Sequence, residues 1–137
     1  MDDSGLWLIG LGPGDLDQMS ISAQSAAKSA EYRFLEGYTA LLPLDEMNKL
    51  ESVIGSWELR MRSSVEHPEE LLDLAQEHRV ALLVVGDPLQ ATTHVDLQLR
   101  CLQRDIPCHV EHGISITTIV TGAAGLQSYR FGRQCTF

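Results

Sequence analysis

The sequence predicts an α/β fold in which a parallel sheet of about five strands is flanked by helices. Short apolar runs alternate with helix-like stretches about five times along the 137 residues. This alternation is typical of parallel strands that are connected by crossover helices. Hydrophobic residues make up 44% of the chain and charged residues 21%, which is the balance of a globular protein rather than a disordered one. The length suits one domain with a real core.

Three strands and two helices are predicted in the first half of the chain. Residues 6–12 form an apolar run that leads into a glycine turn, which is typical of a buried strand. The Ala- and Ser-rich stretch 20–30 suits a helix, and 32–35 is a short strand candidate. Apolar residues recur at helical spacing over 44–54, and the third strand is expected at 57–61.

The middle of the chain carries clearer signals for a helix followed by a strand. Pro68 suits the first helical position, and Glu69 and Glu70 favour the positive start of the helix. Leucine and alanine side chains over 71–75 supply an apolar face. Residues 80–85 are all apolar and predict a fully buried strand.

The last third of the chain continues the alternation. The predicted elements are a helix that is capped by Thr92 or Thr93 and runs to about Arg104, a strand over 106–110, a helix over 115–126 and a strand that starts at 134. Because the chain closes inside this last strand, we expect a truncated chain rather than a natural terminus.

Composition and charge exclude several classes of function. The net charge of −9 argues against a nucleic-acid surface, which needs clustered Lys and Arg. No apolar run reaches the roughly 18 residues of a membrane helix, and the run at 6–11 is too short for a signal peptide. The three cysteines, Cys101, Cys108 and Cys135, form no C-x-x-C pair. We therefore expect a cytoplasmic chain with reduced thiols.

Three unusual segments follow predicted strands. They are Gly10–Gly14, Gly86–Pro88 and His112–Ser115. Parallel sheets bind ligands at the carboxyl ends of their strands, so these segments are the candidate binding site. The glycines of the first segment allow close approach of a ligand to the backbone. The spacing is not G-x-G-x-x-G, however, and a simple tight turn is an equally good interpretation.

Asp87 is the most informative candidate in this set. It lies at a strand end, is followed by proline, and precedes a helix start with free backbone donors. Such a carboxylate can bind the cationic or hydroxyl groups of a ligand. The alternative is an aspartate turn and a threonine cap without any ligand.

The histidines and cysteines predict no further chemistry. His94 is expected to be a surface residue of its helix, and His109 and His112 are expected to point to different faces of a strand end. No histidine pair has the spacing of a helical metal site, so no metal is predicted. Cys101 and Cys108 are expected to be packing residues.

Three blocks of sequence resemble one known family. Residues 86–94 (GDPLQATTH) are similar to the G-D-P-x-x-A-T-T-H segment of the diphthine synthases, which belong to the tetrapyrrole methylase superfamily. The opening LIGLG with Asp15, and EGYT at 36–39, resemble the family's L-I-G-L-G-x-x-D and E-x-Y-T. The stretch from Ile106 to Gly132 is similar to its I-P…H-x-x-S-I…G-L-Q-x-Y-x-F-G run.

This resemblance implies an S-adenosylmethionine-dependent N-methyltransferase. The implied substrate is a modified histidine of translation elongation factor 2, on the route to diphthamide. The family fold has two α/β domains that hold the donor between them, and residues 1–137 resemble only the first, N-terminal domain. The family also implies a homodimer. No nucleic-acid or membrane partner is expected. The donor contacts that the resemblance carries over are Pro13, Asp87, Gln90, Ser115 and Ile116, and no catalytic residue is assigned.

Two other functions stay open on the sequence. One is methylation of a corrin or porphyrin precursor. The other is a non-catalytic module for ligand binding or dimerisation. A sulfonium donor is already activated, so methyl transfer needs in-line positioning more than a nucleophilic side chain or a metal. The absence of a recognisable catalytic triad therefore fits the methyltransferase prediction.

Overall fold

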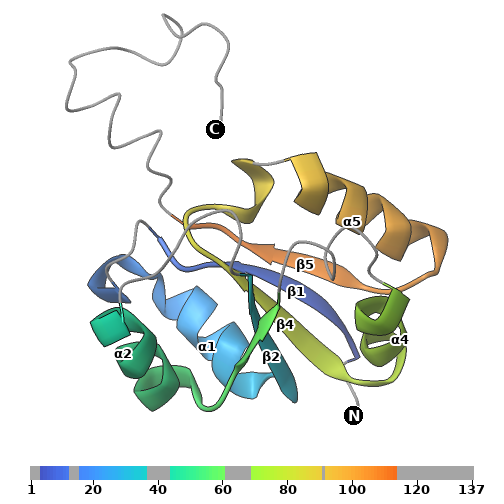
Figure 1. The fold of residues 1–137 in the computed structure, drawn as a ribbon. Helices are drawn as coiled ribbons and strands as arrows, with labels where there is room; N and C mark the ends of the chain where they lie inside the picture. Colours follow the sequence, from blue (N-terminus) through green and yellow to red (C-terminus); the bar gives the residue numbers. More distant parts are fainter. Residues whose placement is uncertain (1–3, 13–15, 37–43, 61–68, 91, 114–137) are drawn as a thin grey trace, which may run out of the picture.

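The computed structural model describes residues 4–12, 16–36, 44–60, 69–90 and 92–113. These residues form a parallel sheet with helices on both faces (Figure 1), so the predicted α/β class is confirmed. The strands are β1 (Gly5–Gly10), β2 (Tyr32–Glu36), β3 (Glu58–Arg60), β4 (Arg79–Val84) and β5 (Cys108–Glu111). Their order in the sheet is β3-β2-β4-β1-β5, and every described pairing is parallel.

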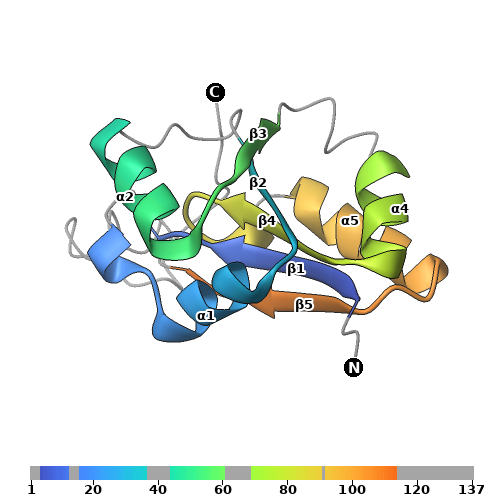
Figure 2. The same ribbon diagram turned by 90° about the horizontal axis from the view of Figure 1, so that it is seen from below.

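The described helices divide between the two faces of the sheet. They are α1 (Ile21–Ser29), α2 (Leu44–Ile54), α4 (Glu69–Glu77) and α5 (Thr92–Gln103), with single 3₁₀ turns η1 (Leu16–Gln18) and η2 (Pro88–Gln90). Figure 2 shows α1 and α2 on one side of the sheet and α4 and α5 on the other. This arrangement explains why the central strands read as continuous apolar runs: both of their faces are covered.

Two clusters of buried side chains form the core, one on each face. Alternate residues of β1 point to opposite faces, with Trp7 and Ile9 in the cluster beneath α1 and α2, and Leu6 and Leu8 in the other. Helix α1 begins after Ser20, whose hydroxyl accepts a hydrogen bond from the Ala23 amide at 3.0 Å. Helix α2 has the bounds predicted from its apolar spacing.

Strand β5 starts two residues later than predicted. Residue Ile106 was assigned to the strand, but its amide donates to the Cys101 carbonyl at 2.8 Å and so helps to end α5. Asp105 has a φ of 56°, which reverses the chain after the helix. The predicted helix over 115–126, the strand from 134 and the helix start at Pro68 lie outside the described residues.

Cys101 and Cys108 are both free thiols that pack in the core, as expected. A hydrogen bond to Cys108 and burial raise the pKa of the Cys101 thiol well above its usual value. The same hydrogen bond lowers the pKa of Cys108, which is also more accessible than Cys101. We expect iodoacetamide to modify Cys108 before Cys101 in the folded chain, as measured by peptide mass mapping over time. Equal rates in the native state would contradict this, and denaturant should remove the difference.

A polar cluster fixes the start of β2 against the start of β4. The Glu31 carboxylate lies 3.0 Å from His78 Nδ1 and accepts a hydrogen bond from the Arg79 amide at 3.3 Å. These two bonds lower the pKa of Glu31 below its usual 4.5, and the bond with His78 has the larger effect. A lowered pKa in the folded state adds stability above the unfolded pKa, and that stability is lost as the pH falls through the folded pKa.

We therefore expect Glu31→Gln to lower the melting temperature at pH 7 and to have a smaller effect as the pH falls below about 4.5. The measurement is the difference in melting temperature between the two chains from pH 7 to pH 2.5. The effect should be small because the Glu31 side chain is 55% exposed and water screens its charge. A difference that stays constant over this range would show that the charge of Glu31 is not responsible.

Candidate functional site

Three segments meet at the carboxyl edge of the sheet. Gly10 is the last residue of β1 and Gly12 follows it, Gly86 follows β4, and Gly113 follows β5. The Gly86 amide donates to the Gly12 carbonyl at 2.7 Å, and the Gly12 amide donates back to Gly86 at 3.3 Å. The described parts of the three predicted segments therefore form one continuous edge, as the parallel topology predicted.

The glycines are needed because the backbones approach very closely. A Cβ atom on Gly10 would lie 2.6 Å from both the Gly113 nitrogen and the Gly86 oxygen. A Cβ atom on Gly113 would lie 2.3 Å from the same Gly86 oxygen. Real side chains do not fit at such distances, so the edge consists of bare backbone that is packed against bare backbone.

Asp87 is held in place on this edge by two hydrogen bonds. Its Oδ1 accepts the Leu89 amide at 2.8 Å, which is the aspartate turn that the sequence suggested. Its Oδ2 lies 2.9 Å from His112 Nδ1, beyond the end of β5. The side chain keeps 14% of its surface exposed. A carboxylate has about four lone-pair sites, so Asp87 can still accept hydrogen bonds from a ligand.

His112 begins one of the three segments predicted to form the binding site, but it is not among the predicted donor contacts, and its contact with Asp87 was not predicted. The signal that could have found it is its position: it follows β5, whose end lies beside that of β1 in the sheet. Of the five predicted donor contacts, Asp87 is described in full and Gln90 is the last residue of η2. Pro13, Ser115, Ile116 and the side chain of Gln90 lie outside the described residues.

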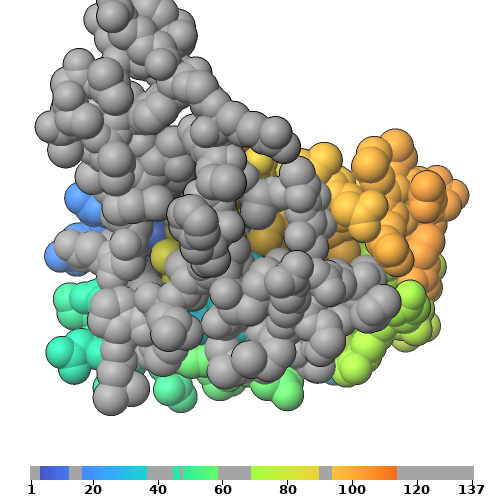
Figure 3. All heavy atoms as spheres, turned by 45° about the horizontal axis from the view of Figure 1, so that its top comes forward, coloured from blue at the N-terminus to red at the C-terminus, as the bar shows by residue number. Residues whose placement is uncertain are grey.

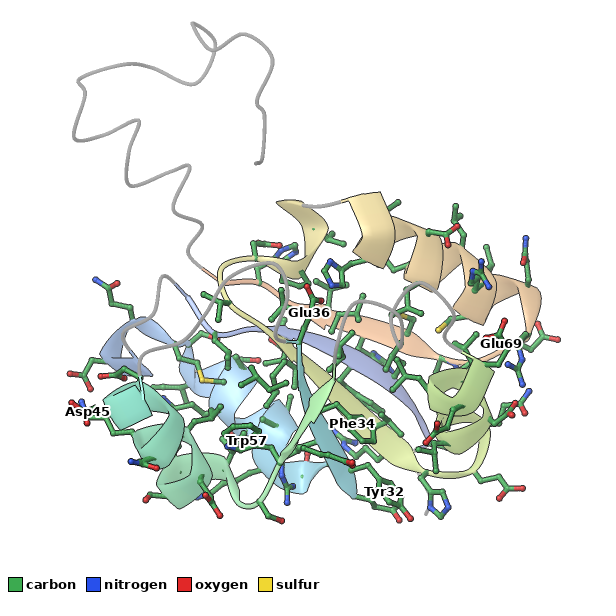
Figure 4. All side chains as sticks on the ribbon, viewed as in Figure 1. Tyr32, Phe34, Glu36, Asp45, Trp57 and Glu69 are labelled. Atoms are coloured by element: carbon green, nitrogen blue, oxygen red, sulfur yellow. The ribbon has the colours of Figure 1, made fainter. Side chains whose placement is uncertain are left out.

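The prediction that His94 is a surface residue is wrong. His94 is completely buried, and its Nε2 forms a very short hydrogen bond with Oε2 of Glu36, which is only 2% exposed. Glu36 is the last residue of β2, and Figure 4 labels it on the ribbon. The partner lies 58 residues upstream, so no local pattern around His94 could indicate burial.

Residues 5–136 match the family model of the tetrapyrrole (corrin/porphyrin) methylases. The chain belongs to this family. Among curated proteins, this methylase chain is 43% identical to the diphthine synthase of Methanoregula boonei over 133 residues, which are 96% of the chain and 53% of that protein. It is 41% identical to the diphthine synthase of Haloquadratum walsbyi, over 96% of the chain and 51% of that protein.

Solved structures give the same result for the methylase fold. A crystal structure of diphthine synthase superposes with a TM-score of 0.84 at 34% identity, covering 93% of this chain and 51% of the other. A putative diphthine synthase from Entamoeba histolytica gives a TM-score of 0.78 at 40% identity, covering 95% and 49%. The chain thus spans about half the length of the relatives that it matches.

Other features of the described part of this methylase chain offer no competing site. Within the described ranges, no group of three or more His, Cys, Asp and Glu side chains could hold a metal ion. His109 stacks on Trp7 with ring centroids 4.4 Å apart and so contributes to packing. A hollow of about 370 Å³ lies among η1, α1 and α2, and Asp87 is not among its described lining residues. No described helix is long and apolar enough to cross a membrane.

Proposed function

We propose that this chain is the donor-binding first domain of a diphthine synthase. The whole enzyme would transfer a methyl group from S-adenosylmethionine to the amino group of a modified histidine on elongation factor 2. The observation that carries the proposal is the 43% identity to a diphthine synthase across 96% of the chain. The position of Asp87 on the carboxyl edge of the sheet supports it, because this edge is where parallel sheets bind ligands.

The residues of the edge suit the task of binding a sulfonium donor. Asp87 supplies a fixed negative charge for the ammonium or hydroxyl groups of the donor, and charge-assisted hydrogen bonds are among the stronger polar contacts. Pro13, Gln90, Ser115 and Ile116 would complete the donor contacts. In the reaction the methyl group leaves the sulfur for the amine nitrogen, and the amine loses a proton. Placing these groups in line supplies most of the catalysis.

Three properties of the whole enzyme belong to the same proposal. A second α/β domain would close over the donor, the enzyme would be a homodimer, and it would work in the cytoplasm. Apolar surface is available for further contacts: Leu99 and Leu102 on α5 are 53% and 74% exposed. Figure 3 shows α5, in orange, at one side of the molecule. A second domain or a second subunit could cover this surface.

The test combines donor binding with methyl transfer. S-adenosylhomocysteine, the product, is titrated calorimetrically into this chain and into the full-length protein. The full-length protein is then given radiolabelled S-adenosylmethionine and elongation factor 2 that carries the unmethylated precursor. We expect label on elongation factor 2. Transfer to a corrin or porphyrin precursor instead would favour the alternative methylase, and binding without any transfer would favour a non-catalytic module.

A further inference from the structure

The Glu36–His94 pair joins β2 to α5, the helix that follows the loop carrying Asp87. Glu36 ends β2, and His94 lies in the first turn of α5. Leu35 pairs with Leu83, so Glu36 lies at the level of the last residue of β4. Alternation from Phe34 directs Glu36 to the face covered by α4 and α5. The connection from β4 to α5 is therefore held at both ends, by the sheet at β4 and by the Glu36–His94 hydrogen bond at α5.

Asp87 and η2 lie in this connection between β4 and α5. At one end, β4 is hydrogen-bonded within the sheet. At the other end, the hydrogen bond from His94 to Glu36 ties the start of α5 to the neighbouring strand β2. Between them, η2 packs against both α5 and β1. A shift of the start of α5 would therefore be transmitted to η2 and to the Leu89 amide that holds Asp87.

The pair is a poor device for stability alone. His94 Nδ1 and Glu36 Oε1 are buried atoms that have no hydrogen-bond partner among the residues that the structure describes. A buried polar atom without a partner destabilises a fold. Buried ion pairs can often be replaced by apolar residues without loss of stability, and in some proteins they are retained because they fix one conformation. Both the location and the unsatisfied atoms therefore suggest a role other than packing.

We propose that Glu36 and His94 are positioning residues, which fix the η2–α5 connection so that Asp87 is presented to the donor. Both side chains are buried, so they act through Asp87 and do not touch the donor themselves. This inference deepens the proposed function and rests on it. The geometric part, that the pair fixes the Leu89–Asp87 turn, stands independently of any ligand.

The experiment compares variants that separate stability from loop geometry. His94→Leu alone leaves a buried carboxylate without a partner, whereas the double variant Glu36→Leu/His94→Leu leaves an apolar contact. The variant Glu36→Gln/His94→Gln keeps a hydrogen bond between side chains of similar length. Asp96→Ala is the matched control, because Asp96 lies on the same helix but forms an exposed ion pair with Arg100 at 3.0 Å.

Three quantities are measured on each variant: the melting temperature, the hydrogen-exchange rate of the Leu89 amide, and the affinity of the full-length protein for S-adenosylhomocysteine. For the double leucine variant we expect a melting temperature near that of the wild type. We also expect Leu89 exchange roughly 10-fold faster and product affinity roughly 10-fold weaker. The double glutamine variant should keep the Leu89 exchange rate and the product affinity near their wild-type values, and so should the Asp96→Ala control.

The proposal is overturned if the Leu89 amide of the double leucine variant exchanges at the wild-type rate, because the pair would then contribute only to packing. If that variant does not fold, Glu36→Met alone decides, because methionine has a similar length but cannot accept the hydrogen bond from His94. Faster Leu89 exchange in this variant supports the proposal, and unchanged exchange refutes it. A wild-type full-length protein that fails to bind S-adenosylhomocysteine would refute the proposed function. The Leu89 exchange rates would still test the geometric inference in that case.

Discussion

Gly10→Ala should destabilise the fold by about 3 kcal/mol and lower the melting temperature by about 10 °C. The added Cβ would lie 2.6 Å from the Gly113 nitrogen and the Gly86 oxygen, and 2.8 Å from the Gly113 Cα. All three atoms belong to backbone that neighbouring strands fix in place. The ends of β1, β4 and β5 would have to separate to admit the methyl group. The same separation would disturb the Asp87–His112 contact, so donor binding should be lost as well.

Gly55→Ala is the matched control for this prediction. Gly55, unlike Gly10, has a left-handed backbone, with φ of 100°, and its Cβ would meet only the end of the Arg33 side chain, at 2.9 Å. Arg33 donates to backbone carbonyls, including those of Ser56 and Ala30, but its side chain is flexible enough to shift by a few tenths of an ångström. The cost should therefore stay near the backbone strain of about 1–2 kcal/mol. Thermal unfolding and product titration of both variants provide the measurement. If Gly10→Ala is no worse than Gly55→Ala, the close approach at the sheet edge is not a real constraint.

Local signals were sufficient to predict most of the fold. Helix α2 spans Leu44–Ile54, as its apolar spacing predicted, because one face of a surface helix needs no information from the rest of the chain. Strand β4 was predicted to within one residue, since a continuous apolar run can be buried only at the centre of the sheet. The predicted start of β5 was wrong because the apolar residue Ile106 helps to end α5, where its amide donates to the Cys101 carbonyl.

The candidate site was predictable only where one residue carries the signal. Asp87 stands out because a strand end, a carboxylate and a following proline coincide at one position. The contacts that orient it do not stand out, since His112 lies 25 residues away. His94 and Glu36 each look ordinary alone, and only the pairing of β2 with β4 brings them together. Relations between distant polar residues depend on topology, which periodicity does not specify.

Asp87→Asn and Asp87→Ala should weaken the binding of S-adenosylhomocysteine to the full-length protein by about 10-fold and about 100-fold, respectively. Asparagine keeps an oxygen that accepts the Leu89 amide, but it removes the negative charge and places an NH2 group where Oδ2 faces His112. Alanine removes both the charge and the acceptor for Leu89 and His112. The difference between the two variants therefore separates the electrostatic contact with the donor from the support of the turn.

The control for this pair is Asp73→Asn, which removes one negative charge from an exposed ion pair between α4 and Arg104, the residue after the end of α5. It should leave affinity unchanged at moderate salt, because exposed charges are screened beyond about 10 Å. Calorimetric titration gives the affinities, and the melting temperature confirms folding. Unchanged affinity in both Asp87 variants would remove Asp87 from the donor site. Equal losses of affinity in Asp87→Asn and Asp87→Ala would show that the charge of Asp87 supplies the whole effect. The hydrogen bond from the Leu89 amide, which asparagine keeps and alanine lacks, would then contribute nothing to affinity.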